Sequence, residues 1–382
     1  MSRKSILFVA PDYHCSFFYR DEFRKLGWKA DIYVPPSYPE KLLYSDKGVL
    51  RAPALPRGGR FANYVNLLLL FAFYLGVCWR YRYHLYYGRF EHFYFGERYV
   101  RIDKVLGPSF SVASFLAKLF RRKIIYLPTG CHDIETRKNF SKLDEGNVCN
   151  NCGSADKCDD RLNTASFGRI RKYADLCVGF GEMESTQYRA THFKYKALDL
   201  SLWRPDLDVP EEYRLPATEK LRILHSFFCE GRNYEGKNIK GSPFILAAIE
   251  RLRQEGHKVE YMYIRDVPSR LMRYYQVQAD IVVEQLIYGW WGSTGVETMA
   301  LGKPVVCYLR PAWKEFFLKV FPEHSELPIV EANTSNIYEV LRKLVTDQDY
   351  RVTMGRKSRQ FAEQHFDARS NALAVSELLL RL

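Results

Sequence analysis

Short apolar runs that end at proline or glycine, separated by stretches of helical period, constrain the fold of this chain most strongly. Such runs lack polar alternation, which is typical of parallel strands buried on both faces of a sheet. In the first half the predicted strands are 5–10, 30–34, 123–127 and 174–179, and the predicted helices are 17–26 and 105–120. This alternation predicts a doubly wound parallel α/β sheet.

A second alternation begins after a polar stretch that carries two prolines, 206–219. Its predicted strands are 221–226, 259–264, 280–283 and 303–309, and its predicted helices are 243–254, 271–278 and 295–301. We therefore expect two tandem Rossmann-like domains that face a cleft. The expected division is an N-terminal domain over 1–205, a linker over 206–220, a C-terminal domain over 221–365, and a C-terminal helix over 366–382 that packs back on the N-terminal domain. The G-x-G-x-x-G fingerprint does not follow the first strand, which argues against an NAD or FAD enzyme.

The charge balance indicates an anionic partner. The 382 residues carry 57 Lys and Arg against 44 Asp and Glu, a formal net charge of +13. Nucleic acid, an anionic membrane face and phosphorylated substrates all suit such a chain.

An uncharged run of 15 residues, 65–79, with arginines on both sides, leaves three interpretations open. It is a buried helix of an α/β domain, a helix lying against the inner membrane face, or a spanning helix, although spanning needs about 20 residues. The N-terminus has too short an apolar run for a signal peptide. We expect a cytoplasmic protein, peripheral on the inner membrane if the second interpretation holds.

A glycine-containing loop between two predicted strands is the most informative segment for chemistry. The run 279–309 passes from a strand through Gly289, Gly292 and Gly295 into a short helix that carries Glu297. Glycines allow a ligand to approach the backbone closely, and a helix N-terminus offers N–H groups to a diphosphate. We expect Gly292, Ser293 and Thr294 to contact the phosphates and Glu297 to accept hydrogen bonds from a ribose diol. An ordinary strand–turn–helix with a surface glutamate is the alternative.

This segment resembles the C-terminal signature of the family-four retaining glycosyltransferases, which have the GT-B fold. The family motif is Glu, seven residues, Glu, within a run ending E-A-M-A-x-G-x-P-V, and the second Glu matches Glu297 in ETMALGKPVV. The first Glu falls at Gly289, which departs from the motif and puts the donor-sugar contacts at that position in question. Some bacterial members carry D-Q-L-x-x-G-W-Y-G before the helix, which resembles EQLIYGWWG at 284–292.

The resemblance implies further site residues. A basic pair holds the diphosphate in the family; Lys240 matches its Lys, and the other cation is Lys237 by spacing or Arg232 by residue type. Two cations suit a leaving group whose charge grows as the glycosidic bond breaks. The loop at Val267 would meet the base through its backbone. His132 stands near the place of a family His beside the donor sugar, with a structural role as the alternative.

Four of the nine cysteines form a cluster in an insert of the N-terminal domain at about 131–160: Cys131, Cys149, Cys152 and Cys158. A C-x-x-C pair is a common half-site for zinc, so we expect a structural zinc ion there, with His132 as an alternative to Cys131. An Fe–S cluster or unmetallated thiols are the other interpretations.

Together these features predict a retaining glycosyltransferase that moves a sugar from a nucleotide-diphosphate sugar to a lipid-linked or surface-polysaccharide acceptor, such as lipopolysaccharide or capsule. The resemblance implies that no catalytic metal is required, because Lys240 and its partner replace it. One alternative is a non-catalytic nucleotide-sugar-binding scaffold of the same fold, which Gly289 favours. A zinc-knuckle nucleic-acid-binding protein is a further alternative, but the acidic residues of the insert argue against it.

Overall fold

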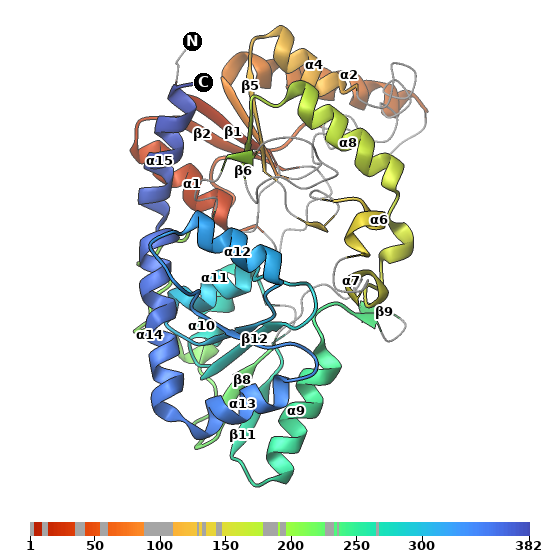
Figure 1. The fold of residues 1–382 in the computed structure, drawn as a ribbon. Helices are drawn as coiled ribbons and strands as arrows, with labels where there is room; N and C mark the ends of the chain where they lie inside the picture. Colours follow the sequence, from red (N-terminus) through yellow and green to blue (C-terminus); the bar gives the residue numbers. More distant parts are fainter. Residues whose placement is uncertain are drawn as a thin grey trace. The chain divides into compact units, whose positions relative to one another are not determined.

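A computed structural model of the chain divides into two units. Unit 1 comprises Met1–Asn139, Asp159–Ala197 and Arg369–Leu382, and unit 2 comprises Phe140–Cys158 and Leu198–Ala368. The structure describes residues 4–9, 14–34, 43–53, 60–87, 110–127, 130–131, 135–142, 147–178, 190–191, 196–225, 233–234, 237–264 and 267–382. Figure 1 shows the helices and strands of both units.

The sheet of unit 1 has seven strands in the order β3-β2-β1-β4-β5-β6-β7, and every neighbouring pair is parallel. The strands are β1 (Ser5–Val9), β2 (Lys29–Tyr33), β3 (Val49–Leu50), β4 (Tyr83–Tyr87), β5 (Lys123–Leu127), β6 (Leu176–Val178) and β7 (Ala190–Thr191). Chain order runs outward in both directions from β1, which is the doubly wound arrangement.

The helices of unit 1 are α1 (Cys15–Lys25), α2 (Arg60–Arg80), α4 (Val112–Leu119), α6 (Arg137–Phe140), α8 (Asp160–Tyr173) and α15 (Ala368–Leu380), of which α6 and α15 each straddle a unit boundary. Side chains of α2, α4 and α8 pack with the strands in one core cluster, to which Tyr74, Ala117 and Phe167 contribute. The Tyr74 hydroxyl donates a hydrogen bond to the Ala113 carbonyl at 2.6 Å and so joins α2 to α4. Helix α15 is joined to the loop before β2 by the Trp28 indole, which donates to the Ser376 hydroxyl at 2.9 Å.

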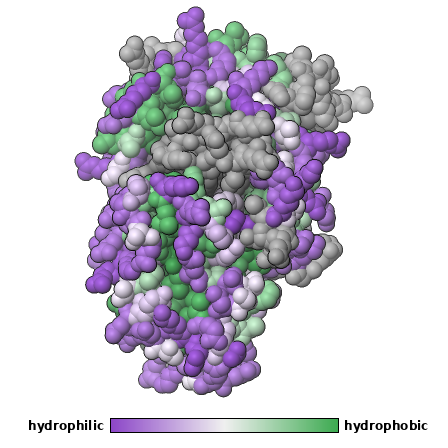
Figure 2. All heavy atoms as spheres, viewed as in Figure 1, coloured by the Kyte–Doolittle hydropathy of each residue, from purple (hydrophilic) through white to green (hydrophobic). Residues whose placement is uncertain are grey.

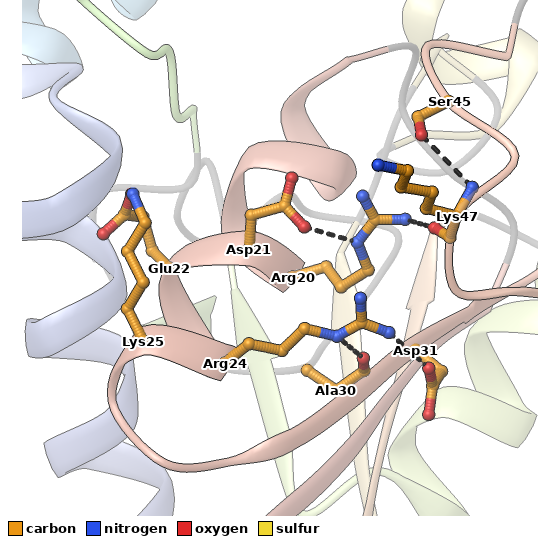
Figure 3. A network of polar contacts seen from close by, with 9 residues as sticks. All are labelled: Arg20, Asp21, Glu22, Arg24, Lys25, Ala30, Asp31, Ser45 and Lys47. Atoms are coloured by element: carbon orange, nitrogen blue, oxygen red, sulfur yellow. Dashed lines mark hydrogen bonds and ion pairs between the residues drawn. The ribbon is translucent and has the colours of Figure 1, made fainter.

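Two arginines of α1 fasten that helix to the chain that follows it (Figure 3). Arg24 donates from Nε to the Ala30 carbonyl at 2.8 Å and from Nη2 to Asp31 at 2.6 Å. Arg20 is buried, donates to Asp21 at 2.8 Å and also donates to the Lys47 carbonyl. A buried guanidinium needs such partners, because an unpaired buried charge is strongly destabilising.

The sheet of unit 2 has five parallel strands in the order β11-β8-β12-β13-β14. The strands are β8 (Leu221–Leu224), β11 (Val259–Met262), β12 (Ile281–Gln285), β13 (Val305–Cys307) and β14 (Ile329–Glu331), and a separate hairpin joins β9 (Asn233–Tyr234) to β10 (Lys237–Asn238). Its helices and 3-10 turns are α7 (Asn147–Asn150), η4 (Ala155–Lys157), η5 (Glu211–Tyr213), α9 (Ser242–Gln254), η7 (Ser269–Leu271), α10 (Met272–Gln276), α11 (Ser293–Ala300), α12 (Pro311–Val320), α13 (Ile337–Thr346) and α14 (Gln348–His365). Figure 2 shows mainly hydrophilic side chains on the visible described surface, with hydrophobic patches between them.

The predicted parallel α/β architecture is confirmed, although single elements differ from the prediction. Strand β4 lies between β1 and β5 and has no counterpart among the predicted strands, because its sequence YHLYY does not look like a buried apolar run. Burial lowers the pKa of His84 in this strand to about 4, so the imidazole is neutral in the sheet at pH 7. The helix predicted over 105–120 contains α4, which begins after Ser111, whose hydroxyl accepts from Ser114 N at 3.1 Å; residues 105–109 lie outside the described part.

The cysteine-rich insert also differs from expectation in its grouping, since Phe140–Cys158 belongs to unit 2 and not to the N-terminal unit. Packing supplies the reason: the Phe140 ring lies 5.9 Å from that of Tyr288 and 6.1 Å from that of Trp313. The apolar segment 65–79 is helical in α2, and Tyr74, Val77 and Cys78 are buried in the core of unit 1. None of the helices in the described part of the chain has the length and apolarity needed to cross a bilayer.

Candidate nucleotide-sugar site

A buried glutamate at the end of β12 organises the glycine loop of unit 2. Glu284 Oε1 accepts a hydrogen bond from Gly292 N at 2.6 Å and lies 3.7 Å from Lys240 Nζ. The carboxylate is buried, whereas the Lys240 side chain keeps 19% of its surface exposed. Glu284 therefore joins the predicted cation to the predicted phosphate-binding loop.

The two later glycines of the loop are needed because of this carboxylate. A Cβ at position 292 would lie 2.8 Å from Glu284 Oε1, and one at position 295 would lie 2.8 Å from the Cβ of Trp291 and closer still to Glu284 Oε2. Such distances are shorter than carbon and oxygen atoms tolerate without a shift of one of them. Glycine at both positions thus lets the loop close over Glu284 without displacing the carboxylate.

Hydrogen bonds to both the backbone N–H and the backbone carbonyl of Lys240 fix the position of this residue. Asn238 Oδ1 accepts from Lys240 N at 2.9 Å, and Lys240 O accepts from Leu286 N at 3.0 Å. The next residue, Gly241, has φ +78° and begins α9, and a Cβ there would lie 3.0 Å from Leu286 Cβ. The left-handed turn at Gly241 therefore lets α9 start directly after Lys240, beside the end of β12.

A buried histidine, His225, lies behind this turn. Its Nδ1 is 2.8 Å from the Val283 carbonyl and its Nε2 is 2.7 Å from the Ser242 hydroxyl. A carbonyl can only accept, so Nδ1 carries the proton and Nε2 accepts from Ser242. Burial, together with the nearby charge of Lys240, lowers the pKa of His225 to about 4. The imidazole is neutral at pH 7 and ties β12 to the first turn of α9.

Glu297 is buried in α11, one turn after the helix begins at Ser293. Its Oε2 accepts from the Gln276 side-chain amide at 2.7 Å. Ser293 and Thr294 lie in the first turn, where backbone N–H groups have no partner within the helix. A carboxylate held by an amide in this way keeps further acceptor sites for a diol.

The structure explains why glycine occupies the first motif position, 289. Gly289 has φ +105°, its carbonyl accepts from Arg310 N at 2.8 Å, and a Cβ would lie 3.0 Å from both Cβ and Nε of Arg310. The Arg310 guanidinium is buried, donates to the Tyr288 carbonyl at 2.9 Å and lies 4.7 Å from the centre of the Trp313 ring. A glutamate cannot occupy position 289 in this conformation without moving Arg310.

The remaining predicted site residues are spread over several segments. Lys237 is half-buried in β10, and Val267 is half-buried just before η7. His132 and Arg232 lie outside the described residues.

The described cysteine segment contains the short helix α7 and the 3-10 turn η4. Backbone hydrogen bonds run from Cys152 N to Cys149 O at 3.3 Å and from Cys158 N to Ala155 O at 3.2 Å, and Cys131 belongs to the other unit. Within the described residues, Cys149, Cys152 and Cys158 do not join a group of three metal-ligating atoms. Zinc at these cysteines stays a prediction.

Three functional candidates had no role in the sequence prediction: His225, Arg310, and Glu284, which appeared there only as the first residue of the EQLIYGWWG run. Glu284 offered a signal, because a carboxylate inside an otherwise apolar strand is costly to bury without a partner. Its partner, Lys240, is 44 positions away in the sequence, so only the fold reveals the pair.

Several solved structures are similar to this chain over nearly its full length. Anabaena HepE in complex with UDP and glucose matches with a TM-score of 0.60 at 14% identity, covering 99% of each chain. A sucrose-phosphate synthase from Thermosynechococcus elongatus matches with a TM-score of 0.62 at 13% identity, covering 98% of each chain. A glycosyltransferase from Rickettsia africae matches with a TM-score of 0.58 at 12% identity, covering 100% of this chain and 99% of the other.

These likenesses show that the chain has the GT-B fold expected from the sequence. No protein-family model and no curated protein sequence matches the chain.

Proposed function

We propose that this protein is a glycosyltransferase that takes its sugar from a nucleotide-diphosphate sugar bound in unit 2. The observation that carries the proposal is the arrangement of Lys240, Glu284 and the Gly292 loop at the start of α11. HepE, which shares the fold, has been solved in complex with UDP and with UDP-glucose, so UDP-sugars are the first donors to test.

In the proposed complex the diphosphate lies between Lys240 and the first turn of α11. The N–H groups of Ser293 and Thr294 face its oxygens, and Lys240 meets the oxygen that leaves the sugar. Glu284 holds the ammonium group in place before the donor arrives. Because the negative charge of the leaving diphosphate grows toward the transition state, a cation positioned in advance lowers the barrier more than it strengthens ground-state binding.

The sugar-binding end differs from the family-four pattern at Gly289. Arg310 and the aromatic residues around it stand where the motif would place a carboxylate. We infer that donor recognition here relies on Glu297 at the ribose and on the cation at the diphosphate, and that the sugar meets the backbone of the 289–292 turn.

We further propose retention of configuration, on the family resemblance. The C1–oxygen bond to the diphosphate breaks and its electron pair leaves with the phosphate oxygen. The acceptor hydroxyl oxygen bonds C1 from the same face, and its proton passes to the departing phosphate oxygen. The protein's residues act by position and charge.

A lipid-linked or surface-polysaccharide glycan is the proposed acceptor, bound by unit 1. Helices α2 and α4, which lie side by side, expose large apolar side chains: Leu68 (69% exposed) and Trp79 (66%) on α2, and Phe115 (48%) and Leu119 (66%) on α4. The exposed Arg80 ends α2. Apolar bulk beside arginine suits docking on an anionic membrane face.

A thermal-shift screen of nucleotide sugars tests the donor proposal. A ligand present at 100 times its dissociation constant raises the free energy of unfolding by about 2.7 kcal/mol, so the donor stands out from the other sugars. NMR of the product formed from that donor then reads the configuration at C1. Binding of the nucleoside diphosphate without turnover of any sugar would favour the non-catalytic scaffold, and the absence of any nucleotide-dependent shift would overturn the proposal.

A further inference from the structure

Three metal-ligating side chains converge where α14 ends, in a part of unit 2 that the proposed donor site does not use. His324 Nε2 lies 2.8 Å from His365 Nε2, and Glu323 Oε1 lies 3.2 Å from that same His365 atom. The ligand atoms of all three residues lie within 4.8 Å of one another, and no other such group occurs among the residues that the structure describes.

The number of protons that the contact between His324 and His365 can hold makes it unusual. Two imidazole Nε2 atoms at 2.8 Å share one proton, because two protonated nitrogens would repel each other. His365 Nε2 faces both the other imidazole and the carboxylate, so three potential lone pairs point at one small region. A divalent cation satisfies all three together, whereas a single proton satisfies two.

Two of the three separations between the ligand atoms are close to those around a tetrahedral ion. Zinc–nitrogen bonds of about 2.0–2.1 Å at tetrahedral angles separate two ligand atoms by about 3.3 Å. The observed separations of 2.8 and 3.2 Å lie within half an ångström of that value. Two imidazoles and one carboxylate are a zinc-type ligand set that leaves a fourth position for water.

The surroundings give the site a rigid side and an open side. His365 is buried, and its ring lies 4.4 Å from that of Phe321 and 4.5 Å from that of Phe361. The Glu323 side chain is 52% exposed, which gives an ion a path from solvent. His365 is the last residue of α14, where the helix dipole favours a positive charge.

We propose that Glu323, His324 and His365 bind one divalent transition-metal ion of the zinc type and that this ion fastens the segment after α12 to the end of α14. Two other contacts already join these segments: Lys357 to Glu326 at 2.5 Å, and the Ser358 hydroxyl to the Pro328 carbonyl at 3.2 Å. The metal adds a third contact between them. Two residues after His365, Asp367 forms a β-bridge with Leu198, and the chain then enters unit 1 at Arg369. Its role is structural.

Metal-stripped full-length protein is titrated with Zn²⁺ alone, and the bound equivalents are counted after gel filtration. His324→Gln and Glu323→Gln each remove one ligand from a side chain that is not fully buried, and His257→Gln is the matched control elsewhere in unit 2. Any zinc held by the cysteines is common to all four proteins and cancels in the comparison. We expect the parent and His257→Gln to bind one equivalent more than His324→Gln, with Glu323→Gln weakened by about tenfold or more.

Co²⁺ in place of Zn²⁺ gives the second readout. The difference spectrum of parent minus His324→Gln should show weak visible bands of a tetrahedral ion and no intense near-ultraviolet band from sulfur. Equal numbers of bound equivalents in the parent and His324→Gln, or a difference spectrum dominated by a sulfur band, would overturn the proposal. Neither result depends on whether the protein transfers a sugar.

Discussion

At the residue scale, the pairing of Lys240 with Glu284 predicts that Glu284→Gln has opposite effects on nucleotide binding and on turnover. Glu284→Gln keeps the acceptor for Gly292 N and removes a negative charge 3.7 Å from the ammonium. The nucleoside diphosphate then meets less repulsion, and we expect it to bind about three- to tenfold more tightly. Turnover should fall, because Lys240 loses the group that positions it. Calorimetry and steady-state kinetics measure the two quantities; looser nucleotide binding in Glu284→Gln would contradict this role.

The glycine loop supports a stability prediction. Gly292→Ala places a Cβ 2.8 Å from Glu284 Oε1 and should lower the free energy of unfolding by about 1–3 kcal/mol, in the range of other overpacked sites. Gly76→Ala is the matched control, because a Cβ in α2 at that position meets no atom within 4 Å and alanine favours the helix by about 1 kcal/mol. Urea unfolding compares the two. Equal stability of Gly292→Ala and the parent would show that Glu284 does not lie beneath the loop.

At the element scale, the junction of β12 and α9 depends on a neutral His225. Its pKa falls from 6.5 in the unfolded chain to about 4 in the folded protein. The unfolded state therefore binds more protons between these values, so the contribution is complete above pH 6.5 and is lost as the pH falls toward 4. The loss is on the order of 3 kcal/mol. His225→Gln should have a flatter dependence of unfolding free energy on pH over this interval, and parallel curves for parent and variant would exclude the neutral histidine.

Helix α2 carries the prediction for membrane binding. Leu68→Ser combined with Trp79→Ser removes two large apolar side chains that are exposed in the described part of that helix and should reduce sedimentation with anionic vesicles. Val352→Ser combined with Leu373→Ser, which are exposed on α14 and α15, is the matched control and should sediment like the parent. High salt should weaken only the part of the attraction that arises from basic residues. If both double variants sedimented equally with the vesicles, the exposed side chains of α2 would have no part in membrane binding, and the helix would serve only the core of unit 1.

At the scale of the whole molecule, the sequence predicted the class of fold because each apolar run is a local signal. The strands at 123–127 and 221–226 correspond to β5 and β8. Strand β4 was missed because Tyr and His dominate its sequence. Its described side chains are buried because the strand lies between β1 and β5, and this position is a property of the fold that no local pattern reveals.

For the candidate site, the sequence indicated Lys240, Glu297 and the glycine loop because each stands in a recognisable local motif. It could not indicate Glu284 as the partner of Lys240, or Arg310 as the residue packed against Gly289, since both contacts join segments far apart in the chain. The group of Glu323, His324 and His365 was hidden for the same reason, because 41 positions separate its histidines.

The affinity of a nucleoside diphosphate for two lysine variants tests the central proposal most directly. UDP, GDP, ADP and dTDP are first compared on the parent by calorimetry, and the tightest ligand is then titrated into Lys240→Ala and Lys258→Ala. Lys258 is the matched control, because it lies in the same unit and its ion pair with Glu219 is exposed. We expect Lys240→Ala to bind about 10- to 100-fold more weakly, the loss of one charge-assisted contact worth about 1.5–3 kcal/mol, and Lys258→Ala to bind like the parent. Equal affinities of Lys240→Ala and the parent would contradict the placement of the donor diphosphate at Lys240.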